Sequence, residues 1–92
     1  MSFTPLALPV PAQSDLADLG RLIDDQGLTP HLTQVRALVR TARGLGISPV
    51  LCQVALDPSA PEPVRERAVA RLIRRVSVVA DLRDHELAAA TA

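Results

Sequence analysis

The placement of proline is the feature of this 92-residue sequence that most constrains its fold. All 8 prolines lie at or before Pro63, and the chain from Val64 onward contains neither proline nor glycine. Proline lacks a backbone N–H and clashes with the preceding helical turn, so a helix can start at a proline but cannot run through one undisturbed. The chain is therefore divided into short segments up to Pro63, followed by one long segment without an interruption.

Residues 1–13 differ from the rest of the chain. They contain Pro5, Pro9 and Pro11, which exclude a helix, and they lack the alternation of a strand. We expect these residues to form an extended arm. Its apolar side chains, which would lie against the body of the protein or against a partner, are Phe3, Leu6, Leu8 and Val10.

Four segments with apolar residues at helical spacing follow the arm. Each of the first three starts with a residue that favours a helix N-terminus, in two cases followed directly by proline. These starts are Ser14, Thr29-Pro30 and Ser48-Pro49. We expect helices at about residues 15–26, 30–44 or 30–46, 49–57 and 61–88.

The composition agrees with helices and not with sheets. Apolar residues make up 48% of the chain, nearly all of them Ala, Leu and Val, with one Phe and no Tyr or Trp. Such a core suits close helix packing, whereas strands favour β-branched and aromatic residues. The sequence thus predicts an all-α fold of four helices in two hairpins. We expect a single domain over residues 14–88 and a frayed tail over residues 89–92.

The fourth helix is too long for its neighbours. At about 1.5 Å of rise per residue it would reach about 40 Å, whereas the first two helices would each reach about 20 Å. Val76 and Val79 continue its apolar stripe, which ends near Ala80, so we expect the last turns to project. Twofold pairing is the commonest way to bury surplus apolar surface, so the sequence predicts a homodimer.

The third helix is apolar on all sides except at Gln53. A helix of this kind is buried on all sides, either by its own chain or by another. Together with the surplus length of the fourth helix, this pattern indicates contacts with a protein partner through both helices.

The charge on the chain is balanced, with 10 acidic residues against 10 arginines and no lysine. A neutral chain has no global field that would attract nucleic acid or anionic lipid. Two local arginine stripes nevertheless occur at helical spacing. They are Arg36, Arg40 and Arg43 on the second helix, and Arg67, Arg71 and Arg74 on the fourth.

Each arginine stripe has two interpretations. The stripe on the fourth helix would contact a phosphate or an acidic protein surface, or it is a solvated face of the helix. The stripe on the second helix would contact nucleic acid, or it pairs with Asp18 and Asp25 across the first hairpin. Exposed pairs of that kind contribute only about 0–1 kcal/mol each.

The stretch SPVLCQVALDPSAPEPVRERAVARL, residues 48–72, resembles one HEAT repeat. In that family an aspartate lies in the turn between two antiparallel helices, and Val-Arg begins the second helix; Asp57, Val64 and Arg65 match. The resemblance implies a hairpin in which Asp57 accepts from the first amides of the fourth helix and pairs with Arg65. The same residues also fit a plain capped helix start, with Ser59 as the N-cap.

A second stretch, TARGLGISPVLCQV, is similar to the core of a helix-turn-helix. Ala42, Gly46 and Ser48 match that family, which implies a DNA-binding regulator that uses residues 42–56, with Ser48 and Gln53 at the nucleic acid. A recognition helix offers polar side chains to base edges. Here Gln53 is the one base-reading group, so two helices joined by a glycine turn are the competing interpretation.

Catalytic chemistry is not indicated by the sequence. The chain has no glycine-rich phosphate loop, no nucleophile motif and no lysine for a Schiff base. Asp81 and His85 have a spacing that can hold a metal, but two ligands do not make a site. We therefore expect no enzyme activity, no metal, no cofactor and no small-molecule substrate.

The sequence also bears on where the protein resides. Its single cysteine, Cys52, cannot form an internal disulfide. No apolar run approaches the roughly 18–20 residues of a membrane span, and the N-terminus lacks the basic region of a signal peptide. We expect a cytoplasmic protein that does not bind membranes.

These expectations combine into two hypotheses. The first is a non-enzymatic interaction module, an adaptor, regulator or assembly subunit, that self-associates through its third and fourth helices. The second is a helix-turn-helix-type DNA-binding regulator. Asp57 and Arg65 would be structural in both. The contact residues of the first hypothesis are Arg67, Arg71, Arg74, Val76 and Val79.

Overall fold

The computed structural model describes the backbone of residues 13–91 and the side chains of residues 14–82. Within this range it contains four α-helices, one 3-10 turn and no strand, which confirms the all-α fold class. The predicted arm lies outside the described residues, except for Gln13, which opens the first helix. The elements are α1 (Gln13–Gln26), η1 (Thr29–His31), α2 (Leu32–Gly44), α3 (Pro49–Leu56) and α4 (Glu62–Thr91).

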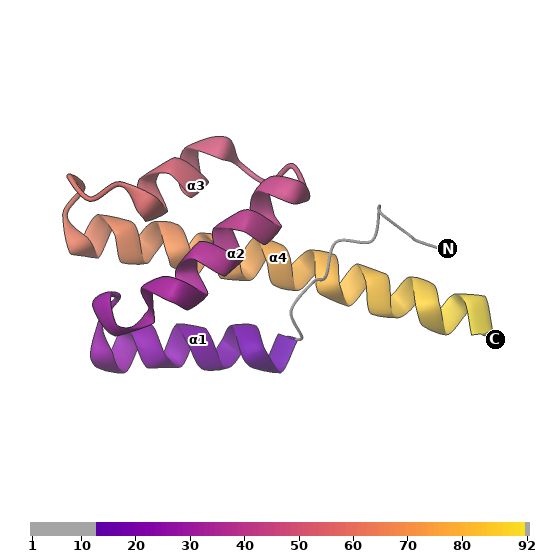
Figure 1. The fold of residues 1–92 in the computed structure, drawn as a ribbon. Coiled ribbons are helices and arrows are strands. Elements are labelled where there is room, and N and C mark those ends of the chain that lie inside the picture. Colours follow the sequence, from indigo (N-terminus) through magenta and orange to yellow (C-terminus); the bar gives the residue numbers. More distant parts are fainter. Residues whose placement is uncertain (1–12, 92) are drawn as a thin grey trace, which may run out of the picture.

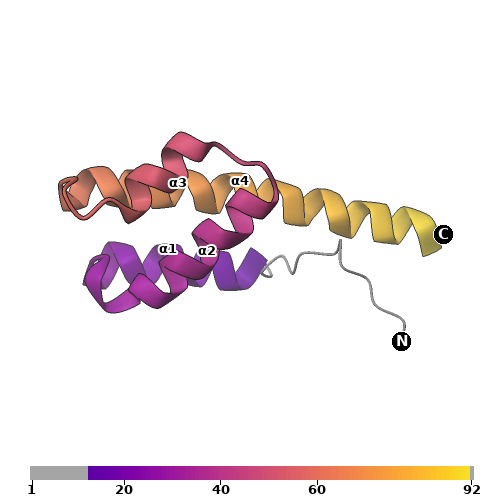
Figure 2. The ribbon, with the colours of Figure 1, turned by 45° about the horizontal axis from the view of Figure 1, so that its top comes forward.

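α4 is the central element and contacts the other three helices. α1 and α3 lie along opposite sides of α4, and α2 crosses over it between them (Figures 1 and 2). α3 packs along α4 as the second predicted hairpin requires, whereas α1 is joined to α2 through the short turn η1 and packs mainly on α4. Gly20 of α1 faces Ile73 of α4, where an added Cβ would lie in ordinary contact, 3.8 Å from the Ile73 Cδ1.

The core consists of the inner faces of all four helices. Every helix contributes at least one apolar side chain that is almost completely buried, and α4 contributes the most. Full burial of such a side chain stabilises the fold by about 1.5–3 kcal/mol. The largest fully buried side chains are Leu28, Val35, Val39, Cys52, Val69, Leu72 and Val76.

The turn between α1 and α2 is joined to the start of α4. Gly27 ends α1 as predicted, with a φ of +83° and its N–H donating to the Ile23 carbonyl at 2.8 Å. The N–H of the next residue, Leu28, donates to the Glu62 carboxylate at 3.1 Å. One side chain of α4 therefore satisfies a backbone donor 34 residues earlier in the chain.

Two of the predicted helix starts need correction. Thr29 does not cap α2, because residues 29–31 form a 3-10 turn without a side-chain cap, and α2 begins at Leu32. α1 begins before Ser14, which therefore lies inside its first turn. The third start is confirmed, since Ser48 is the N-cap of α3 and Pro49 its first residue.

α2 ends in a turn that depends on Gly46. The Ile47 N–H donates to the Ala42 carbonyl at 2.9 Å, and the Gly46 N–H donates to the Arg43 carbonyl at 3.0 Å. This pair of bonds is a Schellman motif, and it requires a left-handed residue, here Gly46 with a φ of +74°. The turn directs the chain into α3, which runs back along α4 (Figure 1).

α4 is one continuous helix of 30 residues. At about 1.5 Å per residue it is about 45 Å long, close to the longest dimension of the molecule, 46 Å. Its C-terminal part extends beyond the other helices, as expected (Figures 1 and 2). The helix includes residues 89–91, which we had expected to belong to a frayed tail.

Candidate protein-binding surface

α3 is a short helix without a charged residue, and it lies at one side of the molecule (Figure 1). The Ser48 side-chain oxygen positions its start by accepting a hydrogen bond from the Leu51 N–H at 3.4 Å. The inner side of α3 packs in the core, but Val50 is 68% exposed and Gln53 is also exposed. The chain's own helices therefore leave one side of α3 uncovered.

A groove with a volume of about 210 Å³ lies between α3 and α4. Its apolar lining comes from Leu51 and Val54 of α3 and from Val64 of α4. Arg67 and Arg71 line the same groove, so two predicted contact residues lie beside apolar side chains of α3. Such a groove can accept an apolar side chain whose neighbours are carboxylates.

The placement of Val76 corrects the predicted contact surface. Val76 is 0% exposed and belongs to the core, so it cannot touch a partner while the fold is intact. Val79 is half-buried. The exposed apolar residues on this part of α4 are instead Val78, at 56%, and Leu82, at 58%.

The sequence contained a signal for these exposed residues. Val64, Arg71 and Val78 recur every seven residues and therefore share one side of the helix. The same spacing relates Val69 to Val76, which share the core side.

Arginines accompany the exposed stripe of α4. Arg67, Arg71, Arg74 and Arg75 are all exposed. Among the residues whose side chains are described, none of these four guanidinium groups has an ion-pair or hydrogen-bond partner. We call these four the α4 arginine row, and together with the exposed and half-buried apolar residues beside them they make the α3–α4 surface. Its apolar residues are Val50, Leu51, Val54, Val64, Val78 and Leu82.

The arginines of α2 lie on the other side of α3. They line a cavity of about 290 Å³ that also includes Leu56, at the end of α3. The ion pairs expected between these arginines and α1 are not present in the described part of the chain, where Asp18 pairs with Arg21 of its own helix. α3 is therefore flanked by arginines on both sides. The α2 residues are Arg36, Arg40 and Arg43.

Asp57 and Arg65 organise the turn between α3 and α4, but not as the ion pair that the HEAT resemblance implies. Asp57 accepts hydrogen bonds from the Ser59 hydroxyl at 2.6 Å and from the Ser59 N–H at 2.9 Å. The hydroxyl bond, the N–H bond and the charge of Arg65 lower the pKa of Asp57. The Arg65 Nε donates to the Ala55 carbonyl at 3.2 Å, which ties α4 to the end of α3.

The residues assigned to the DNA-binding alternative have different environments. The Ser48 oxygen is engaged in capping α3. Gln53 is exposed, and its neighbour on the outer side of α3, Val50, is apolar. An uncharged helix with this outer face offers little to base edges or phosphates.

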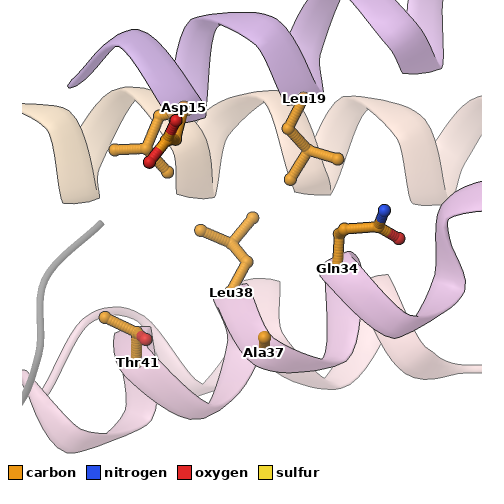
Figure 3. Close-up of a pocket in the computed structure, with 7 residues that line it drawn as sticks. Asp15, Leu19, Gln34, Ala37, Leu38 and Thr41 are labelled. Carbon is orange, nitrogen blue, oxygen red and sulfur yellow. The ribbon is translucent and has the colours of Figure 1, made fainter. Parts of the chain in front are cut away.

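A cleft between α1 and α2 is a further candidate for a ligand site. Figure 3 shows Leu19 of α1 and Leu38 of α2 pointing toward one another across it. Its volume is about 210 Å³, below the roughly 300–1,000 Å³ of typical ligand pockets. The polar residues Asp15 and Gln34 at this cleft are exposed and do not converge on a buried point. We assign the cleft to incomplete packing of α1 against α2.

Among the side chains of residues 14–82, no group of three or more His, Cys, Asp or Glu residues could hold a metal ion. No helix of the described chain is long and apolar enough to cross a membrane. The side chain of His85, which shares a potential ligand spacing with Asp81, lies outside the described range.

Comparison of the chain with protein-family models, with curated proteins and with solved structures gives no match. The similarities to a HEAT repeat and to a helix-turn-helix are thus local ones, confined to residues 48–72 and 41–54.

Proposed function

We propose that this protein is a non-enzymatic interaction module that self-associates, at least to a homodimer, through the α3–α4 surface. The observation that carries the proposal is the uncovered side of α3, where exposed Val50 lies beside an apolar groove bordered by arginines. Apolar residues at the centre and arginines around them are typical of protein interfaces. In this proposal the protein acts as an adaptor, regulator or assembly subunit.

The projecting half of α4 supports the same proposal. Val78 and Leu82 are exposed there, although Ala80 between them is buried. Burial of these side chains against a second chain would remove apolar surface from water, at about 25 cal/mol for each Å². Self-association provides that burial without requiring any other protein.

Size-exclusion chromatography with light scattering and refractive-index detection tests the proposal. Refractive index is needed because the chain has no Trp or Tyr and absorbs little at 280 nm. We expect a mass above that of the 9.8 kDa monomer, which falls to the monomer in Val50→Glu and in Leu82→Glu. The matched control is Thr33→Glu, the same change at an exposed position of α2 outside the α3–α4 surface. A monomeric wild-type protein at all concentrations would refute the proposal.

A second candidate function, a helix-turn-helix-type DNA-binding regulator, is favoured by one observation. Among the described residues, the three arginines of α2 are exposed and have no acidic partner. Their guanidinium groups could contact phosphates, and such binding would weaken steeply with salt. Monitoring 260 nm in the same experiment tests this candidate. A 260 nm peak that travels with the protein and leaves it at high salt, or in Arg40→Ala, would support DNA or RNA binding.

A further inference from the structure

The charges of this neutral chain are separated in space. α1 carries Asp15, Asp18, Asp24 and Asp25 against the single basic residue Arg21. α2 carries three arginines and no acid, and the described part of α4 carries five arginines against three acids. α1 and α3 lie on opposite sides of α4 (Figures 1 and 2). The molecule therefore presents an acidic side at α1 and a basic side around α3.

The separation of acidic and basic sides indicates which surface of a second copy can bind the α3–α4 surface. Twofold pairing would place the same surface on both copies, so two α4 arginine rows would face each other. Like charges placed opposite one another weaken an interface and select against that partner. The acidic α1 side has the opposite charge, so it is the more favourable partner surface on the same molecule.

The outer stripe of α1 carries an exposed apolar side chain as well as the complementary charge. Asp18, Leu22 and Asp25 follow each other at spacings of four and three residues and so share one face of the helix. Leu22 is 38% exposed and lines one hollow together with Asp18, Asp25 and Arg21, the ion-pair partner of Asp18. We call Asp18, Leu22 and Asp25 the α1 acidic stripe. It is an apolar side chain flanked by carboxylates, which is the complement of the α3–α4 groove.

The spacings of the charged residues also agree. Asp18 and Asp25 are seven residues apart, as are Arg67 and Arg74, so each pair spans about 10.5 Å along its helix. Arg71 lies between the two arginines, as Leu22 lies between the two aspartates. Two helices placed side by side can therefore bring both charge pairs together at once.

We propose that the α1 acidic stripe of one copy docks on the α3–α4 surface of the next. This inference rests on the proposed function and names the partner surface of that same site. Leu22 would enter the groove lined by Leu51, Val54 and Val64, with Asp18 and Asp25 opposite Arg67 and Arg74. Asp18 would exchange its partner Arg21, on its own helix, for an arginine of the next copy. Each copy carries both surfaces, so assembly is head-to-tail and continues past a dimer unless a ring closes.

Charge reversal on each surface separately tests this arrangement. We expect Asp18→Arg/Asp25→Arg to be monomeric at concentrations where the wild type associates, and Arg67→Glu/Arg74→Glu to be monomeric too. An equimolar mixture of the two variants should associate again, because each offers a surface complementary to the other. The apparent dissociation constant of either variant alone should rise by about tenfold or more. Asp24→Arg is the matched control, since Asp24 is exposed on α1 outside the acidic stripe.

The outcomes separate this inference from the proposed function. If Asp18→Arg/Asp25→Arg associates as well as the wild type while Val50→Glu does not, self-association stands and the α1 stripe is refuted as its partner. A wild-type mass that stops at a dimer, together with that result, would identify twofold pairing instead. If the purified wild type associates only with nucleic acid, both proposals fail. Circular dichroism of each variant verifies that it is folded before its mass is interpreted.

Discussion

The two halves of α4 differ although they belong to one helix. Among the described side chains, residues 62–76 contribute four of the five buried residues of α4, whereas the half from Ser77 onward contributes Ala80, and its C-terminal turns extend beyond the other helices (Figure 1). Val76 and Val78 are the same residue type two positions apart, yet Val76 is fully buried and Val78 is largely exposed. Position around the helix, and the length of the neighbouring helices, therefore decide burial here. The covered half stabilises the fold, and the projecting half is available for association.

A charge placed in the covered half should have the largest effect. Val76→Glu would bury a carboxylate among apolar side chains without a partner, which destabilises a domain by about 3–5 kcal/mol. A domain of this size has a free energy of unfolding of about 5–10 kcal/mol. We expect a large fall in the thermal midpoint, or loss of the helical signal, when unfolding is followed by circular dichroism. A Val76→Glu protein with the wild-type midpoint would show that Val76 does not belong to the core.

A smaller effect is expected where the covered half is tied to the α1–α2 turn. Glu62→Ala removes the acceptor of the Leu28 N–H, and a part-buried donor without a partner costs about 1–2 kcal/mol. Urea unfolding followed by circular dichroism measures this loss. Glu62→Gln is the matched control, because its amide oxygen can still accept the hydrogen bond, so it should lose less. Equal losses in the two variants would mean that the negative charge near the helix N-terminus matters, and not the hydrogen bond.

Lowering the pH should destabilise the turn before α4, because it protonates the Asp57 carboxylate. The two bonds from Ser59 and the charge of Arg65 hold the pKa of Asp57 below its ordinary value of about 4. The folded state therefore favours the ionised carboxylate, and this stabilisation is present above about pH 4 and is lost as the pH falls through the lowered pKa. In Asp57→Asn the free energy of unfolding should depend less on pH below about pH 4, as measured by urea unfolding at several pH values. Ser59→Ala should reduce the dependence in the same direction, because it removes the hydroxyl donor.

The smallest effect on stability is expected in the projecting half. Val78→Glu places a charge on a side chain that already faces water, so the free energy of unfolding of the monomer should change by less than about 0.5 kcal/mol. The same variant should reduce the mass measured by light scattering. A large loss of monomer stability would show that Val78 is part of the packed domain, and the distinction between the two halves would not hold.

Local signals predicted most of the fold. Ser48-Pro49 located the start of α3, and Gly27 located the end of α1, because a capping side chain and a left-handed residue act within one turn of the chain. Thr29-Pro30 carried the same kind of signal but was wrong by one turn, since a 3-10 segment opens α2 instead. Such a segment was not indicated by any residue pattern in the sequence.

The candidate surface was predicted less completely, for a physical reason. The sequence identified α3, α4 and the arginines as the contact region, and these residues do lie around one groove. The sequence placed Val76 among the contact residues because a helical projection shows which residues share one side of the helix. It does not show which of those sides the other helices cover. Likewise, the sequence supplied Asp57 and Arg65 as a possible pair, but Arg65 reaches the Ala55 carbonyl instead. Tertiary placement decided both cases.

The position of α1 has a consequence for the order in which the protein folds. α2, α3 and α4 are consecutive in the chain and pack on one another, whereas α1 packs mainly on α4, as where Gly20 faces Ile73. Contacts between distant parts of a chain require a large loop to close, so they form late. We expect a three-helix nucleus to form first and α1 to dock on it last. In the native state α1 would then be the first helix to open, and its amides would be the first of the four helices to exchange with solvent.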